Sequence, residues 1–123
     1  MREILFRGKR EDNGEWVYGY FEKYNGRTYI NLQTERLNTG GYPIREFVEV
    51  IPETIGQYTG LVDKNGNKVF GGDIVRFSTA HAREIKYIDG CFGFEGSSIP
   101  IKYVNKFEVI GNIHDNPELL EVE

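Results

Sequence analysis

Four dipeptides in which glycine follows asparagine or aspartate constrain the fold of this chain more than any other feature. They are Asn13-Gly14, Asn25-Gly26, Asn65-Gly66 and Asp89-Gly90. A type I′ turn requires a positive φ at both central residues, which such a pair tolerates, so each dipeptide is a candidate two-residue hairpin. Once a turn is placed, every cross-strand partner follows from it, so each hairpin predicts a definite register.

For three of the turns, the resulting cross-strand pairs combine apolar or oppositely charged side chains. These pairs are Phe21 with Ile30 and Glu22 with Tyr29 around Asn25-Gly26; Val62 with Val69, Leu61 with Phe70 and Asp63 with Lys68 around Asn65-Gly66; and Ile85 with Phe94 and Tyr87 with Phe92 around Asp89-Gly90. A half-buried antiparallel hairpin requires this kind of sidedness. Folding at Asn13-Gly14 is less favourable, because it places Asp12 directly opposite Glu15.

The rest of the chain also predicts strands rather than helices. No segment of about 11 or more residues has apolar positions at helical spacing. Residues 46–51, 73–78 and 106–113 are the remaining strand candidates. At the C-terminus, Asn116 is suited to an N-cap and Pro117 to the first position of a helix of little more than one turn.

We therefore predict an all-β fold of antiparallel hairpins with a short C-terminal helical turn. The strand candidates form two clusters, so we expect an N-terminal hairpin subdomain at 1–57, a second β subdomain at 58–116 and a helical tail at 117–123.

Composition excludes several classes of protein. With 39% hydrophobic residues and 17 aromatic ones (8 Phe, 8 Tyr, 1 Trp), the chain is not intrinsically disordered. Its net charge of −4 provides no broad basic field for nucleic acid, and its single cysteine provides no disulfide framework. No apolar run approaches the roughly 18 residues of a membrane helix, and the stretch at 1–7 is too short for a signal peptide. We expect a cytoplasmic protein.

The residues that catalysis usually needs are sparse. Cys91, His81 and His114 make up the whole Cys/His set. We interpret Cys91 as a small buried residue, His81 as a loop residue, and His114 as a strand end before the helix. A calcium loop starting at Asp63 would need glycine at its sixth position and glutamate at its twelfth, where this chain has lysine and isoleucine. We therefore expect no catalytic residue, no metal and no cofactor.

One group of residues is a candidate binding face. If the first two hairpins have two-residue turns, Lys9 lies opposite Tyr18, Arg7 lies opposite Tyr20, and Tyr29 is diagonal to Tyr20. The full candidate set is Arg7, Lys9, Trp16, Tyr18, Tyr20 and Tyr29. Such a face could stack on bases or on a partner protein, with cation–π contacts. Alternatively, the aromatic residues are core or a self-association interface whose edges the cations cover.

The order of these elements resembles that of the YopX-like proteins of bacteriophages and prophages. The matching segments are FRGK at 6–9, WVYG at 16–19, VIPETIGQYTGL at 50–61, DKNG at 63–66, GDIV at 72–75 and EVIGNIHDNPELL at 108–120. The resemblance implies a β-rich fold whose C-terminal half is an SH3-like barrel, and a phage or prophage product acting inside a bacterium. It implies no catalytic or ligand residues.

Two functional hypotheses follow from these observations. The first is a phage- or prophage-encoded, non-enzymatic interaction module that self-associates through its N-terminal aromatic strands and has a host or phage protein as partner. Both faces of residues 16–21 are rich in apolar side chains, which favours self-association to cover the second face. The second hypothesis is a nucleic-acid-binding small β-barrel that uses the same residues.

Overall fold

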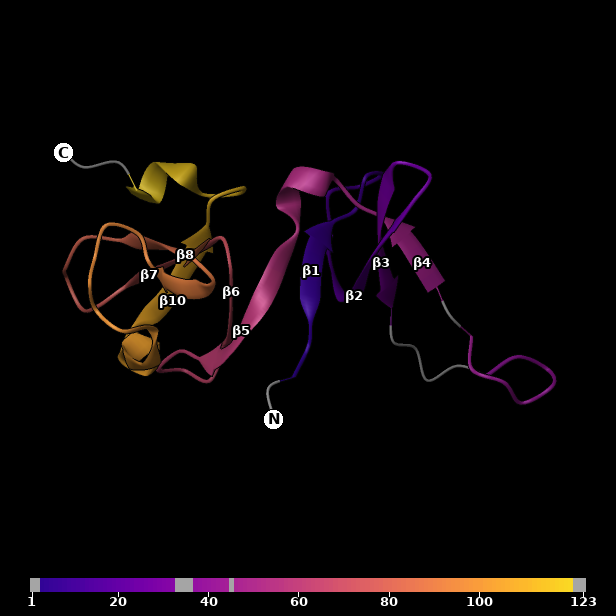
Figure 1. Cartoon of the computed structure of the whole chain (residues 1–123), viewed down its shortest axis with the longest axis horizontal. Helices are drawn as coiled ribbons and strands as arrows, with labels where there is room; N and C mark the ends of the chain where they lie inside the picture. The colour runs from indigo at the N-terminus through magenta and orange to yellow at the C-terminus, as the bar shows by residue number, and fades with distance from the viewer. Residues whose placement is uncertain (1–2, 33–36, 45, 121–123) are drawn as a thin grey trace. The chain divides into compact units, whose positions relative to one another are not determined.

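The computed structural model describes residues 3–32, 37–44 and 46–120 of the 123-residue chain. Its ten strands are β1 (Phe6–Lys9), β2 (Trp16–Tyr24), β3 (Arg27–Leu32), β4 (Glu46–Glu49), β5 (Gly56–Val62), β6 (Lys68–Phe70), β7 (Asp73–Arg76), β8 (Arg83–Ile88), β9 (Cys91–Phe94) and β10 (Glu108–Asn112). Three short 3₁₀ helices are η1 (Pro52–Thr54), η2 (Ile101–Lys106) and η3 (Pro117–Leu120). Figure 1 shows these elements, which confirm the prediction of an all-β fold.

The chain divides into two compact units, Glu3–Gln57 and the part from Tyr58 onward, called here the N-terminal and C-terminal units. In the N-terminal unit the strands are antiparallel in the order β4-β3-β2-β1, and the first residues of β5 pair with β1. One face of this sheet buries Ile30 and Val50 almost completely. Gly8 fits closely here, because a Cβ at this position would lie 3.0 Å from Val50 and 3.1 Å from Ile55.

Two of the predicted hairpins have the register that the turns imply. Around Asn25-Gly26, the pairs Phe21–Ile30 and Glu22–Tyr29 are confirmed. The pairs Ile85–Phe94 and Tyr87–Phe92 around Asp89-Gly90 are confirmed as well. In both turns the two central residues have a positive φ, as a type I′ turn requires.

The predicted register at Asn65-Gly66 is wrong by one residue next to the turn and by three at Phe70, which lies opposite Tyr58 rather than Leu61. Val62 lies opposite Lys68 rather than Val69, and only the glycine of the turn has a positive φ. The cause is the Asp63 carboxylate, whose Oδ1 accepts hydrogen bonds from the backbone N–H groups of Asn65 and Asn67, both at 2.9 Å. These bonds favour a longer loop over a two-residue turn, and the register of the two strands shifts again between Tyr58 and Val62.

The predicted register at Asn13-Gly14 is wrong by two residues. Arg7 lies opposite Tyr18 rather than Tyr20, and Lys9 lies opposite Trp16 rather than Tyr18. The loop is longer than two residues because the Arg10 N–H bonds the Glu15 carbonyl at 2.8 Å, across four intervening residues. Asp12 avoids the expected repulsion from Glu15 by pairing with the Arg10 guanidinium at 2.9 Å. A shift of two residues leaves each side chain on its expected face.

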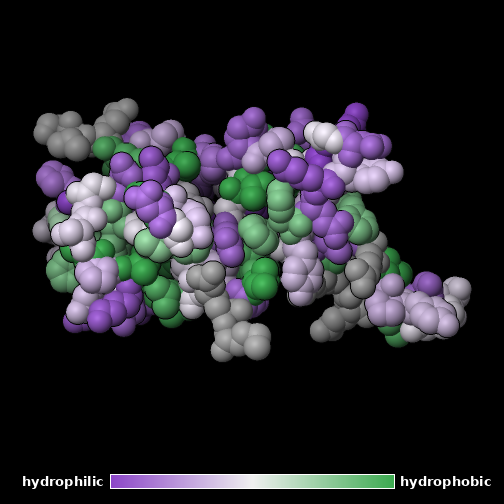
Figure 2. All heavy atoms as spheres, in the orientation of Figure 1, coloured by the Kyte–Doolittle hydropathy of each residue, from purple (hydrophilic) through white to green (hydrophobic). Residues whose placement is uncertain are grey.

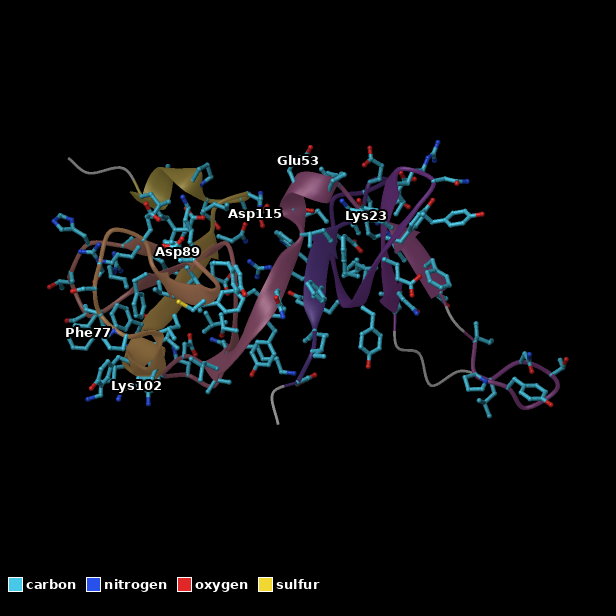
Figure 3. All side chains as sticks on the ribbon, viewed as in Figure 1. Lys23, Glu53, Phe77, Asp89, Lys102 and Asp115 are labelled. Atoms are coloured by element: carbon cyan, nitrogen blue, oxygen red, sulfur yellow. The ribbon has the colours of Figure 1, made fainter. Side chains whose placement is uncertain are left out.

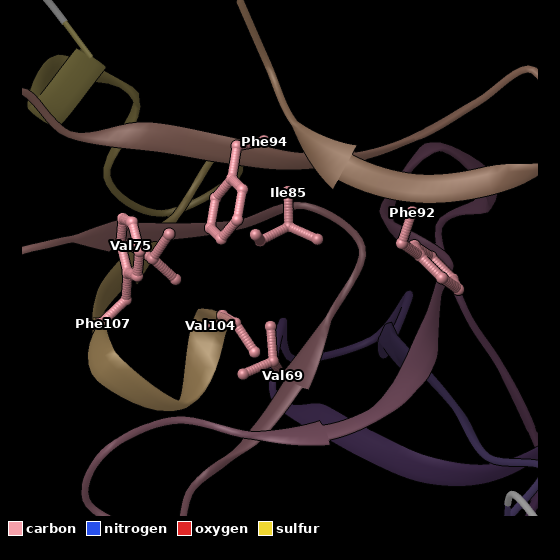
Figure 4. Close-up of a cluster of buried hydrophobic side chains, with 7 residues drawn as sticks. All are labelled: Val69, Val75, Ile85, Phe92, Phe94, Val104 and Phe107. Carbon is pink, nitrogen blue, oxygen red and sulfur yellow. The ribbon is translucent and has the colours of Figure 1, made fainter. Parts of the chain in front are cut away.

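The C-terminal unit contains a second antiparallel sheet in the order β10-β7-β8-β9. Its core is a cluster of buried side chains, namely Val69, Val75, Ile85, Phe92, Phe94, Val104 and Phe107 (Figure 4). The rings of Phe94 and Phe107 stack with centroids 4.6 Å apart. Among the strands of the described chain, no pairing closes this sheet into a barrel, because β9 and β10 are its two edges. The SH3-like barrel is therefore not confirmed.

The other three predicted strand segments, 46–51, 73–78 and 106–113, contain β4, β7 and β10 respectively, and each strand is shorter than its segment. In β10 the alternation breaks at a bulge between Val109 and Gly111. The C-terminal helix is the single turn η3, and residues 121–123 lie outside the described part of the chain. Asn116 directly precedes η3, and its Oδ1 accepts a hydrogen bond from the Asn112 N–H at 3.3 Å.

Candidate functional site: an aromatic face of the N-terminal sheet

The candidate binding residues lie on the face of the N-terminal sheet opposite the buried Ile30 and Val50. Alternate residues of β2 project to the same side of the sheet, so Trp16, Tyr18 and Tyr20 share one face. Tyr18 and Tyr20 are 48% and 44% exposed. We call this surface the aromatic face and define it by Arg7, Lys9, Trp16, Tyr18, Tyr20, Tyr24, Tyr29 and Phe47.

Trp16 lies between the two cations of β1. The Arg7 guanidinium carbon is 4.7 Å from the centre of the Trp16 ring, and Lys9 Nζ is 5.6 Å from it. Arg7 is only 7% exposed, so its charge lies against the ring rather than in water. Cation–π contacts of this kind stabilise by about 0.5–2 kcal/mol, depending on desolvation. This end of the aromatic face is therefore an ordered cation–aromatic cluster.

The structure brings the predicted site residues onto one face, although with different partners. Tyr29 lies opposite Glu22 and hence diagonal to Tyr20, as predicted. Tyr24 and Phe47 also lie on this face and were not among the predicted site residues. Tyr24 continues the alternation of β2 and could have been found from it, whereas Phe47 joins the face through the pairing of β4 with β3, opposite Asn31.

The far end of the aromatic face carries acidic groups and a shallow pocket. Glu22 and Glu49 lie opposite Tyr29 on its two sides, and Glu49 Oε1 is 3.3 Å from Arg27 Nη1. A pocket of about 320 Å³ is lined by Glu22, Lys23, Tyr24, Tyr29 and Phe47. Figure 3 labels Lys23 in this unit, and Figure 2 shows hydrophobic residues at the surface among hydrophilic ones.

The charges of the aromatic face are separated along β2. Lys9 lies opposite Trp16 at the first residue of β2, and Glu22 lies six residues further along the same strand. At about 3.3 Å per residue, these two charged positions are roughly 20 Å apart. Tyr18 and Tyr20 lie between them on the same face. The face is therefore basic at one end, acidic at the other and aromatic in the middle.

The other residues considered for chemistry are not assembled into a reactive site. Cys91 is exposed, with its Sγ 3.5 Å from the carbonyl oxygen of Ile88, so the expectation of a buried cysteine is wrong. The residue follows the tight turn at Asp89-Gly90, where the hairpin projects into solvent. Among residues 3–32, 37–44 and 46–120, no three His, Cys, Asp or Glu side chains are grouped as a metal site.

No helix in the described part of the chain combines the length and apolar character needed to cross a membrane.

Comparison with known proteins places the chain in a family. Residues 5–121 match the family described as YopX protein. The chain is also similar to the crystal structure of protein EF1440 from Enterococcus faecalis, with a TM-score of 0.65 and 26% sequence identity. That similarity covers 98% of this chain and 100% of the other. No curated protein matches the sequence. Because the family match extends over nearly the whole sequence, the chain belongs to the YopX family.

Proposed function

We propose that this protein is a non-enzymatic interaction module that self-associates through the aromatic face. We further propose that it is a phage or prophage product acting in the cytoplasm of the bacterial host, where the assembled module binds a host or phage protein. The observation that carries self-association is the exposure of Tyr18 and Tyr20 on a sheet whose opposite face already forms the core. Contiguous exposed aromatic surface of this kind marks interaction sites.

The amount of aromatic surface is compatible with a second copy as the occupant. Stable interfaces start at roughly 1,200 Å² of total buried area, and a fully buried aromatic side chain supplies about 150–250 Å². Six aromatic residues lie on the aromatic face, and Tyr18, Tyr20, Tyr24 and Phe47 are exposed by roughly half or more. Two such faces together offer roughly 850 Å² of exposed surface from these four aromatic residues, so the charged and polar residues around them must supply the rest of the interface.

The charge distribution favours a second copy in an antiparallel arrangement. A two-fold interface pairs residue i with residue j and residue j with residue i. If the axis passes between Tyr18 and Tyr20, Lys9 of one copy approaches Glu22 of the partner subunit, and the reverse pair forms at the other end. The aromatic residues are then buried at the centre, where interface energy is usually concentrated.

Nucleic acid is a less favourable occupant of this surface. Phosphate contacts require accessible cations. Arg7 is buried against Trp16, and Glu22 and Glu49 contribute negative charge to the same face.

Sedimentation equilibrium over a wide concentration range tests self-association. We expect Lys9→Glu and Glu22→Lys each to raise the dimer dissociation constant about tenfold, because each creates two like-charge contacts per dimer. The double variant restores the opposite pairing and should return close to wild type. Glu53→Lys is the matched control, because it makes the same charge reversal as Glu22→Lys at an exposed residue of η1 in the same unit, outside the aromatic face.

A wild-type protein that stays monomeric at its highest soluble concentration would overturn the proposal. Equal weakening by Glu53→Lys, or no rescue in the double variant, would refute the antiparallel arrangement. Loss of dimer on addition of a single-stranded oligonucleotide would instead assign the aromatic face to nucleic acid.

A further inference from the structure

The C-terminal unit has its own pocket, which none of the sequence predictions included as a site. The pocket has a volume of about 330 Å³ and is lined by Phe77, Ala80, His81, Arg83, Ile99, Tyr103, Lys106 and Phe107. These residues come from the loop after β7, the first residue of β8, the loop before η2, and η2 with its flanking residue. In Figure 3, Phe77 and Lys102 are labelled at the same end of this unit.

The floor of the pocket is aromatic and held by the core. Phe107 is buried and stacks on Phe94, while its ring centroid is also 5.6 Å from that of Phe77. Phe77 and Tyr103 remain 49% and 41% exposed, so both rings offer surface to a ligand. The loop that presents Phe77 is tightly folded, because the Ala80 N–H donates to the Phe77 carbonyl at 2.9 Å.

All the titratable side chains of the lining, apart from the phenol of Tyr103, are basic: His81, Arg83 and Lys106. Lys102 Nζ and Lys106 Nζ lie 5.3 Å and 6.0 Å from the centre of the Tyr103 ring, so two ammonium groups gather at one aromatic residue. Among the residues that the structure describes, no carboxylate lines the pocket, although acidic residues outnumber basic ones in the whole chain. The local charge therefore favours an anion.

Glu95 contacts Arg83 without neutralising its charge. Arg83 Nη1 donates to the backbone carbonyl of Glu95 at 3.0 Å, which is an uncharged acceptor. The Glu95 carboxylate is instead 3.7 Å from Lys86 Nζ. An anionic ligand would supply the negative charge that the pocket itself lacks.

We propose that this pocket binds single-stranded nucleic acid. One base stacks against the rings of Phe77 and Tyr103, and the neighbouring phosphates contact Arg83, Lys102 and Lys106. Proteins that bind single strands without sequence preference combine cationic side chains with exposed aromatic rings in this way. The pocket shares no residue with the aromatic face, so binding here does not require self-association.

An acidic peptide is the competing occupant, and the geometry favours it less. Peptides that add to a sheet need an open strand edge for main-chain hydrogen bonds. Here the lining comes mainly from loops and the 3₁₀ helix η2 rather than from a strand edge. The described lining residues include no Asn, Gln, Ser or Thr, so they can stack and neutralise charge but offer few groups that read a particular sequence.

Fluorescence anisotropy with a labelled 12-nucleotide oligo-dT and the full chain at low salt tests the proposal. We expect Tyr103→Ala to weaken binding about 5- to 150-fold, the loss of one base–aromatic stack, and Tyr103→Phe to keep most of the affinity. The matched control is Tyr87→Ala, which removes an exposed tyrosine from β8 of the same unit. Circular dichroism of each variant shows whether it is folded.

The salt dependence of the binding affinity distinguishes a residue that contacts phosphate from one with a purely structural role, because only the first changes it. Each lost phosphate contact should reduce the slope of log affinity against log salt by about 0.7 for a single strand. We expect this change for Lys106→Gln but not for Lys86→Gln. The proposal would be overturned if wild type does not bind the oligonucleotide at low salt, or if the control variants lose as much affinity as the pocket variants. It would also be overturned if an acidic phenylalanine-containing peptide binds in place of the oligonucleotide.

Discussion

The substitution Asp63→Asn removes a negative charge from the loop between β5 and β6 while keeping the size of the side chain. Asp63 is 3% exposed, and its carboxylate organises two parts of the C-terminal unit. Oδ1 accepts from the backbone N–H groups of Asn65 and Asn67, both at 2.9 Å. Oδ2 accepts from the Val109 N–H at 3.0 Å and from Asn67 Nδ2 at 3.3 Å. The residue thus ties the loop to β10.

The expected loss of stability follows from the number of donors that converge on the side chain. Asparagine keeps one acceptor oxygen but turns its NH₂ group toward donors, so two hydrogen bonds are lost. A hydrogen bond to a charged group contributes about 1.5–3 kcal/mol, and buried donors without an acceptor add to the cost. Because such terms are not additive, we expect a loss of about 3 kcal/mol in the free energy of unfolding of the C-terminal unit at pH 7.

The same residue predicts a pH dependence. Burial raises the pKa of Asp63, but the hydrogen bonds from Val109, Asn67 and Asn65 outweigh it and hold the pKa below its ordinary value. A carboxylate with a lowered folded-state pKa stabilises above its unfolded pKa of about 3.9 and loses that contribution as the pH falls through the folded pKa. Wild type should therefore lose stability below about pH 4 more steeply than Asp63→Asn.

Urea unfolding followed by far-UV circular dichroism, with amide hydrogen exchange in β7 and β8, measures the effect in the correct unit. Trp16 fluorescence serves as an internal reference, because the single tryptophan lies in the N-terminal unit. Asp89→Asn is the matched control: it makes the same change in an exposed turn where asparagine also accepts a positive φ. An Asp63→Asn variant with the wild-type urea midpoint at pH 7 would refute the reasoning.

Two further substitutions, Gly19→Ala and Phe94→Ala, test the packing of the N-terminal and C-terminal units respectively. A Cβ at Gly19 would clash with the backbone carbonyl oxygen of Asn31, so we expect Gly19→Ala to destabilise the N-terminal unit by about 3 kcal/mol or more, measured by Trp16 fluorescence in urea. Gly93→Ala has no atom within 4 Å of the added Cβ and should change stability by less than about 0.5 kcal/mol; a similar loss in both variants would contradict the steric argument. Phe94→Ala removes a fully buried ring and should cost the C-terminal unit about 3–5 kcal/mol, measured by circular dichroism; a loss below about 1 kcal/mol would place Phe94 outside the core.

Turn chemistry explains which registers could be predicted. In Asn25-Gly26 and Asp89-Gly90 both central residues adopt a positive φ, so the two-residue rule gave every pair correctly. In Asn13-Gly14 and Asn65-Gly66 a nearby side chain stabilises a longer loop, through Asn13 Oδ1 and the N–H of Glu15 in the first and through Asp63 in the second. The aspartate two residues before Asn65 was an available signal for this difference.

The candidate site was predictable in part for the same reason. Alternation along β2 places Trp16, Tyr18 and Tyr20 on one face whatever the register, because a shift of two residues preserves sidedness. Phe47 could not be assigned to that face from sequence, since β3 and β4 are distant along the chain and their pairing depends on the assembled sheet. The exposure of Cys91 was missed because burial depends on what packs against a hairpin, not on the hairpin alone.

The sequence by itself determined the all-β class, two hairpin registers and the sidedness of the aromatic strands, because turn geometry and the two-residue period of a strand are local properties. Only the tertiary structure decided the contact of Asp63 with Val109 and the gathering of Phe77, Arg83 and Tyr103 around one pocket. Asp63 is 46 residues from Val109, and Tyr103 is about 20 residues from Arg83; they meet because burying Val75, Ile85 and Phe107 in one core brings their neighbours together.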